Sequence, residues 1–108
     1  MDSGLITFRE CTNDGTKIYI YYSDVMHYWC AYGYSAYIID RCDTPKVENV
    51  IRKFSEELQM PILIMEPNLV KELKDLYPAE RLILGMSLTL PSAFDVSGYL
   101  EWAAQLRS

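Results

Sequence analysis

The sequence has too few cysteines, in the wrong spacing, for a disulfide framework or a structural zinc site. Its 108 residues include three cysteines, Cys11, Cys30 and Cys42, and no two of them form a C-x-x-C pair. Disulfide-stapled domains carry an even number of cysteines and are secreted, and structural zinc ligands come in closely spaced pairs. We therefore expect reduced cysteines in a cytoplasmic protein, and we expect no metal and no other cofactor.

The chain has a single histidine, which limits acid–base and nucleophilic chemistry. His27 lies three residues before Cys30, so a helix would place both on one face and a strand would place them on opposite faces. A catalytic cysteine needs a thiolate beside a base. Because aromatic residues surround the pair, we interpret Cys30 as a buried thiol. Glycine-rich phosphate-binding loops are missing as well, so the motifs favour a protein without catalysis.

Positive charge is scarce where aromatic side chains are most frequent. The formal net charge is −5 at pH 7, and no lysine or arginine occurs between Lys17 and Arg41. Proteins hold nucleic acids largely through lysine and arginine contacts with the phosphates. Nucleic-acid binding is therefore not expected.

The chain also lacks a long apolar run. Its longest uncharged apolar stretch is interrupted by Ser23, Asp24, His27 and Gly33, which leaves no segment able to span a bilayer. No basic region followed by an apolar stretch is present at the N-terminus, so we expect no secretory signal and no membrane association.

What is present is the composition of one globular domain. Half of the residues are hydrophobic and 23% are charged, which is ordinary for a folded protein. A chain of this length is near the usual size of a domain with one core. We expect residues 1–108 to form a single globular domain.

The first half of the chain has mostly strand-like patterns. Residues 5–10 and 17–22 alternate in polarity, and the turn signal at 13–15 predicts that they form an antiparallel hairpin. Residues 24–33 combine helical spacing with many aromatic side chains and a glycine, so a helix, a loop and a strand all stay open. Residues 34–40 are typical of a further strand.

The second half alternates between helical and strand-like patterns. An apolar stripe after a Thr-Pro start predicts a helix over 45–58, and a wholly apolar run at 61–65 predicts a strand covered on both faces. A second stripe predicts a helix over 69–77. Residues 81–90 are strand-like, and a final helix is expected to begin at Ser92.

This order of elements predicts an α/β fold. Strands joined by helical crossovers are expected to be parallel to one another. We therefore expect a mixed sheet with an N-terminal antiparallel β-hairpin followed by a parallel β-α-β-α-β-α half.

Polar side chains follow the predicted parallel strands where each strand ends. In parallel sheets, ligands bind beyond the carboxyl ends of the strands. Convergence at one edge would create a metal or small-ligand site from Asp40, Asp43, Glu66 and Ser92. The competing interpretation is that such residues only cap the following helices.

Tyrosine is concentrated in one segment. Residues 18–39 hold seven of the nine tyrosines, and strand alternation places Tyr19 and Tyr21 on the face opposite Ile18 and Ile20. Three interpretations stay open for this tyrosine row. It is covered by residues 24–33, it binds a protein partner or a second copy of the chain, or it stacks on bases. The predicted partner-binding residues are Tyr19, Tyr21, Tyr34, Tyr37 and Trp102.

These patterns favour a small acidic binding protein without catalysis. Its type would be an inhibitor, immunity or accessory protein that engages a protein partner or itself, as a homodimer, through the tyrosine-rich sheet region. The alternative is a small enzyme or a metal- or ligand-binding domain that uses the acidic residues at the strand ends.

Overall fold

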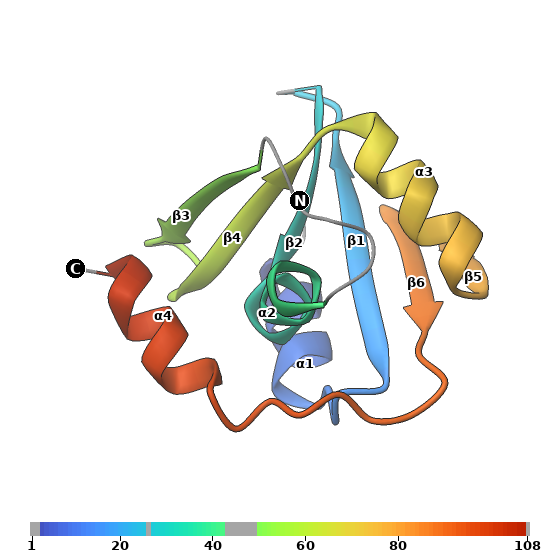
Figure 1. Ribbon diagram of the computed structural model, residues 1–108. Helices are drawn as coiled ribbons and strands as arrows, with labels where there is room; N and C mark the ends of the chain where they lie inside the picture. The colour runs from blue at the N-terminus through green and yellow to red at the C-terminus, as the bar shows by residue number, and fades with distance from the viewer. Residues whose placement is uncertain (1–2, 26, 43–49, 108) are drawn as a thin grey trace.

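The computed structural model describes residues 3–25, 27–42 and 50–107, which contain six strands and four helices. In chain order the elements are α1 (Ser3–Cys11), β1 (Lys17–Ser23), β2 (Tyr28–Tyr32), α2 (Gly33–Arg41), β3 (Ile51–Ser55), β4 (Met60–Met65), α3 (Pro67–Leu76), β5 (Ala79–Leu82), β6 (Gly85–Thr89) and α4 (Tyr99–Arg107). Figure 1 shows these elements along the chain.

The strands form one sheet with the order β3-β4-β2-β1-β6-β5, and each neighbouring pair is antiparallel. The expected parallel half is therefore wrong, and the fold is α+β. The sheet consists of three hairpins, β1–β2, β3–β4 and β5–β6. Helix α2 joins β2 to β3, and α3 joins β4 to β5. The strands joined by each helix point the same way, but other strands lie between them, so no parallel neighbours form.

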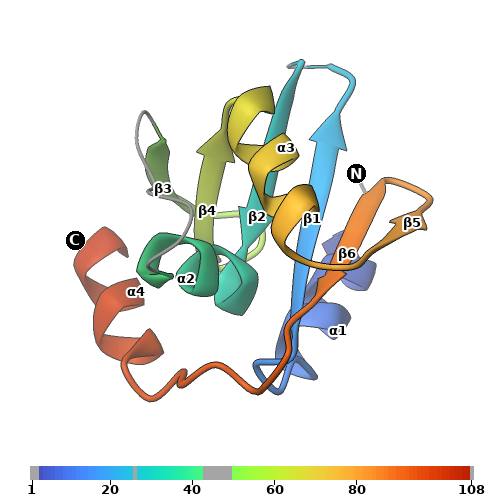
Figure 2. The ribbon, with the colours of Figure 1, turned by 45° about the vertical axis from the view of Figure 1, so that its right-hand side comes forward.

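The helices cover the two faces of the sheet unequally. Helices α2, α3 and α4 pack on one face, here called the helical face, and α1 packs on the other, here called the α1 face (Figures 1 and 2). The main core lies on the helical face, where Ile18, Ile20 and Leu88 of the sheet meet Ile39 and Leu73 of the helices. The smaller core on the α1 face joins strand residues to α1. Its buried members are Ile6, Tyr21, Cys30, Tyr32, Met60 and Ile62.

Two predictions in the first half of the chain are wrong. Residues 5–10 belong to helix α1, whose buried side chains Ile6 and Glu10 are one helical turn apart. Residues 34–40 belong to helix α2, which begins at Gly33 with a φ of +54°. Residues 28–32 form strand β2, so of the conformations left open for segment 24–33 the strand is the one found in this part.

The second half also differs from its predicted pattern. Residues 51–55 form strand β3 instead of the end of a helix, and the start of that predicted helix lies outside the described residues. The predicted strand 81–90 is the β5–β6 hairpin, and the last helix begins at Tyr99 instead of Ser92. Strands β1 and β4 and helix α3 were predicted nearly at their observed bounds.

Candidate functional site

The tyrosine row on β1 is covered by α1. Tyr19 and Tyr21 project to the α1 face, as the alternation predicted. The Arg9 guanidinium lies 5.7 Å from the centre of the Tyr19 ring and 5.8 Å from that of Tyr21, and Arg9 Nη1 donates a hydrogen bond to Tyr21 Oη at 3.4 Å. Tyr21 is fully buried, which raises its pKa to about 12, whereas Tyr19 is partly exposed. The interpretation that residues 24–33 fold back over the row is wrong for residues 28–32, because they form the neighbouring strand β2.

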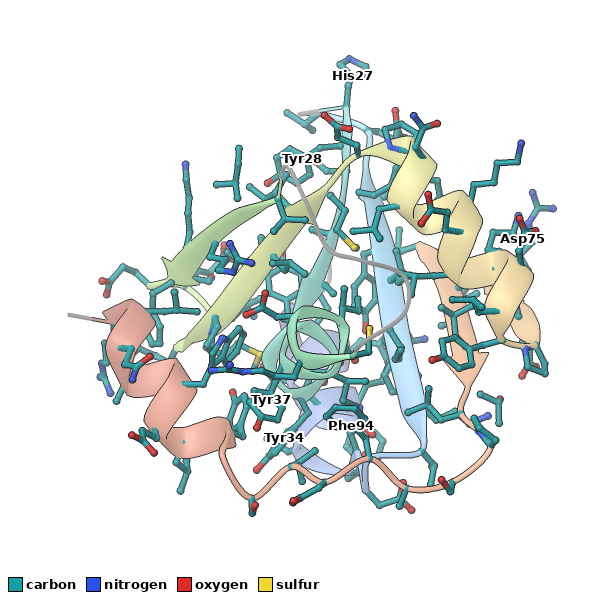
Figure 3. The ribbon with its side chains drawn as sticks, in the orientation of Figure 1. His27, Tyr28, Tyr34, Tyr37, Asp75 and Phe94 are labelled. Atoms are coloured by element: carbon teal, nitrogen blue, oxygen red, sulfur yellow. The ribbon has the colours of Figure 1, made fainter. Side chains whose placement is uncertain are left out.

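Tyr34, Tyr37 and Trp102 lie together on α2 and α4, not on the strand that carries that row. Tyr34 and Tyr37 belong to α2, and Figure 3 shows them near Phe94, below α2. The rings of Tyr34 and Tyr99 stack at 4.0 Å between centroids, and those of Tyr37 and Trp102 meet edge-on at 5.4 Å. Tyr37 is 8% exposed and Trp102 is 5% exposed. These ring contacts pack α4 against α2. Of the three predicted partner-binding residues in this cluster, Tyr34 alone has a partly exposed side chain.

The residues predicted at the strand ends are separated. Asp40 Oδ1 accepts hydrogen bonds from Arg52 Nε at 2.9 Å and Nη2 at 2.6 Å, and its Oδ2 accepts one from Trp102 Nε1 at 2.9 Å. Glu66 and Ser92 are exposed in other parts of the molecule, and Asp43 lies outside the described residues. The antiparallel sheet removes the geometric reason to expect convergence. Among the residues described, no group of three or more His, Cys, Asp or Glu is placed to hold a metal ion.

Asp40→Ala is expected to lower the free energy of unfolding by about 2 kcal/mol. It leaves the buried Trp102 N–H without its acceptor, which costs about 1–3 kcal/mol. The ion pair with Arg52 adds little because the Arg52 side chain is 41% exposed. Urea denaturation measures the loss, and Asp75→Ala on the exposed face of α3 is the matched control. Equal midpoints for the two variants would contradict a structural role for Asp40.

Cys30 has the environment of an inert thiol. It is buried on the α1 face, and burial raises its pKa to about 11. His27 is exposed at the tip of the β1–β2 hairpin (Figure 3). The interpretation of Cys30 as a buried thiol is confirmed, and none of the three cysteines forms a disulfide within the described residues.

A groove of about 540 Å³ lies on the helical face between α3 and the β5–β6 hairpin. Tyr22 and Trp29, from the ends of β1 and β2, form an aromatic pair in it, with ring centroids 5.0 Å apart. Met86 of β6 and Ala79 of β5 add apolar surface. The twelve lining residues are Tyr22, Asp24, Trp29, Lys74, Ala79, Glu80, Arg81, Leu82, Ile83, Leu84, Gly85 and Met86.

Two cations line this groove. Arg81 pairs with Met86 and therefore projects on the helical face, whereas Glu80 pairs with Ser87 on the α1 face. Lys74 reaches the groove from α3. Within the described part of the chain, neither Lys74 nor Arg81 makes an ion pair or a side-chain hydrogen bond. The lining also includes two carboxylates, Asp24 and Glu80, so its formal charges balance. Because Glu80 projects on the other face, the positive charge of Lys74 and Arg81 remains available to a ligand beside the aromatic and apolar floor.

The rim of the groove carries the most exposed apolar side chain among the described residues. Ile83, in the turn between β5 and β6, is 94% exposed. A single exposed apolar side chain is common on protein surfaces, but Ile83 belongs to the same lining as Tyr22, Trp29 and Met86. Apolar surface gathered in this way and rimmed by polar residues is typical of an interaction site. Sequence patterns missed this turn because residues 81–90 alternate well enough to predict one continuous strand. The glycine at position 85 was the signal that could have revealed it.

Comparisons with known proteins identify no relative of this chain. No protein-family model matches the chain, and neither the curated proteins nor the solved structures gave a match. None of the helices in the described ranges is long and apolar enough to cross a membrane.

Proposed function

We propose that this chain is a small protein-binding module without catalysis, and that its partner binds at the groove beside Tyr22 and Trp29. The observation that carries the proposal is the almost complete exposure of Ile83 at the rim of an aromatic groove. Tyrosine, tryptophan, methionine and arginine are enriched in protein interfaces, and the groove contains all four. A cytoplasmic inhibitor, immunity or accessory protein agrees with the small size, the net charge of −5 and the free thiols.

The lining of the groove favours binding over chemistry. Its twelve residues include no histidine, cysteine, serine or threonine, so no Ser–His or Cys–His type of nucleophile–base pair lies among them. Aromatic rings instead offer large contact area at a low cost in side-chain entropy. Of the residues predicted for partner binding from the sequence, Tyr19 and Tyr34 retain exposed surface outside the groove. They define the competing binding surfaces.

Ile83→Asp is expected to weaken partner binding about tenfold to a hundredfold. Burying an isoleucine side chain contributes about 1.5–3 kcal/mol, and aspartate would lose that contribution. The partner would be captured by cross-linking in the cells of origin, purified, and titrated against each variant. Leu100→Asp on α4 is the matched control because Leu100 is also exposed, at 76%, but lies outside the groove.

The same titrations separate the competing surfaces. Equal affinities for Ile83→Asp and Leu100→Asp would contradict the groove as the binding surface. A loss with Tyr19→Ser alone would move the site to the α1 face. Sedimentation equilibrium tests self-association, and a monomer at all concentrations would exclude the homodimer.

A further inference from the structure

Strand β5 is an edge strand whose outer backbone groups face away from the sheet. Thr89 N donates a hydrogen bond to Pro78 O at 3.0 Å, so the backbone of Pro78 faces β6. In an antiparallel pair, every second residue then faces the neighbouring strand and the residues between them face away from it. Glu80 therefore directs its N–H and C=O toward β6, and Ala79 and Arg81 direct theirs outward. Figure 2 shows β5 at the outer margin of the sheet. Such a row of backbone groups can pair with an added strand.

The opposite edge of the sheet is less open. Helix α4 packs beside β3, and the Arg107 guanidinium lies 5.2 Å from the centre of the Phe54 ring. Arg52 of β3 is fixed by its two hydrogen bonds to Asp40 of α2. Of the two edges, β5 is the one beside a groove with unpaired cations.

Charge on β5 disfavours pairing with a second copy of the chain. Only the outward backbone groups of Ala79 and Arg81 are available for pairing. The two-fold axis that relates two antiparallel β5 strands must therefore pass through a residue position and not between two residues. Centring on Glu80 places two glutamates directly opposite each other, and centring on Arg81 places two arginines opposite each other. Centring on Ala79 opposes no like charges, but it places Arg81 opposite Tyr77, whose N–H already donates to Leu73 O. Like charges at opposed positions are destabilising. A strand of different composition has no such penalty.

The side chains beside the outer edge indicate what that strand would carry. Ala79 lies on the helical face opposite Leu88 and is small, so an added strand could pass a large side chain over it and diagonally toward Met86, which lines the groove. Two residues along, the added strand would lie beside Arg81 with Lys74 nearby. A carboxylate at that position would meet both unpaired cations.

We propose that β5 accepts an extended segment of the partner protein as a seventh strand, with a large apolar side chain and an acidic side chain two residues apart facing the groove. This inference rests on the proposed function and names the mode of binding. Backbone hydrogen bonds to Ala79 and Arg81 give affinity, and the groove and its cations select the side chains.

The probe is an alternating hexapeptide with phenylalanine and glutamate two residues apart, compared with the same peptide carrying lysine in place of glutamate. In the saturated complex, amide hydrogen exchange should slow at Ala79 and Arg81 but not change at Glu80, whose N–H already faces β6. The glutamate peptide should bind at least about tenfold more tightly than the lysine peptide. Arg81→Glu should reverse that preference, whereas Lys71→Glu, the same charge change on α3 outside the groove, should not.

Ala79→Pro tests the backbone contact directly. The Ala79 N–H points away from β6, so proline should leave the ladder intact while removing one outward donor. At least about tenfold weaker peptide binding is expected. Wild-type binding by this variant, or unchanged exchange at Ala79 and Arg81 in the unmodified chain, would overturn strand addition. If the chain formed a dimer and Ala79→Pro dissociated it, the added strand would come from a second copy of the chain, and the proposal of a different partner protein would be refuted.

These outcomes are distinct from failure of the proposed function. If Ile83→Asp abolishes partner capture while the exchange test fails, the groove is the binding surface and strand addition is refuted. If Ile83→Asp has no effect, the proposed function is contradicted and the inference is refuted with it.

Discussion

Gly85→Ala is expected to destabilise the fold by about 3 kcal/mol or more. Gly85 begins β6 opposite Tyr21 of β1, and β6 is paired on both sides, with β1 and with the edge strand β5. A Cβ atom there would collide with the carbonyl oxygen of Ile20 and would lie 2.8 Å from both the Ile20 carbonyl carbon and the Tyr21 Cα. These are backbone atoms of a strand paired on both sides, so they cannot move without breaking β1–β6 pairing. The cost therefore reaches or exceeds the upper end of the range for overpacking.

Urea denaturation of Gly85→Ala checks the prediction, with Gly98→Ala as the comparison. A Cβ at position 98 would meet the Tyr37 hydroxyl at 2.6 Å, which is the end of a side chain and can shift at lower cost. We therefore expect Gly98→Ala to be the more stable variant. If Gly85→Ala unfolded within about 1 kcal/mol of the unmodified chain, the observed register of β1 and β6 would be contradicted. That register also positions the β5–β6 hairpin beside Tyr22.

Local patterns predicted the elements whose burial repeats regularly along the chain. Ile18 and Ile20 alternate with Tyr19 and Tyr21 because the two faces of β1 meet different cores. Residues 61–65 form a continuous apolar run because β4 is covered on both faces. Neither signal depends on which strand is the neighbour. Both strands were therefore predictable without knowledge of the topology.

Helix α2 was missed because contacts distant in the sequence determine it. Residues 34–40 are rich in tyrosine and isoleucine, which favour strands. Helix α1 supplies an acceptor for the first turn of α2, since Glu10 Oε1 receives a hydrogen bond from Ser35 N at 2.9 Å. Residues 5–10 were themselves predicted as a strand. Because α1 was predicted as a strand, its hydrogen bond to the first turn of α2 could not be anticipated. The two wrong assignments together led to the wrong sheet topology.

The groove could be anticipated only in parts. Tyr22 and Trp29 belong to the tyrosine-rich segment that the sequence singles out, and the alternation correctly placed Tyr22 on the isoleucine side of β1. Their meeting with Arg81 and Ile83 depends on β6 pairing with β1 across more than sixty intervening residues. Sequence periodicity carries no information on such a pairing. The sequence therefore indicated the aromatic residues of the groove, but it did not indicate that they would lie beside the β5–β6 hairpin.

Glu10→Gln is expected to remove a dependence of stability on pH worth about 3 kcal/mol. Glu10 is 1% exposed, and its carboxylate accepts hydrogen bonds from Ser35 N at 2.9 Å and from Ser35 Oγ at 2.7 Å. The hydrogen bonds and the positive charge of Arg9 lower the pKa of Glu10, but burial of the carboxyl raises it by more. The net effect is a rise in the pKa from 4.5 to about 7. The folded state therefore holds this proton more tightly than the unfolded state. That difference corresponds to about 3 kcal/mol.

The sign of the effect follows from the raised pKa. Below pH 4.5 the carboxyl is protonated in both states, and its contribution to stability is fully present. As the pH rises toward 7 the unfolded chain releases the proton first, so stability falls, and above about pH 7 the loss is complete. Glutamine is neutral at every pH, and its amide can accept from Ser35 N–H and donate to Ser35 Oγ. The variant should therefore gain about 3 kcal/mol relative to the unmodified chain between pH 4.5 and 7.5.

Urea denaturation at several pH values measures this relative gain, and comparison between variants cancels the titration of the other carboxylates. Glu101→Gln is the matched control, because Glu101 is an exposed glutamate on α4. It should track the unmodified chain at all pH values. A difference between Glu10→Gln and the unmodified chain that stays constant from pH 4.5 to 7.5 would mean that Glu10 is ionised at the same pH in both states. The α1–α2 junction would then hold its carboxylate charged at little cost.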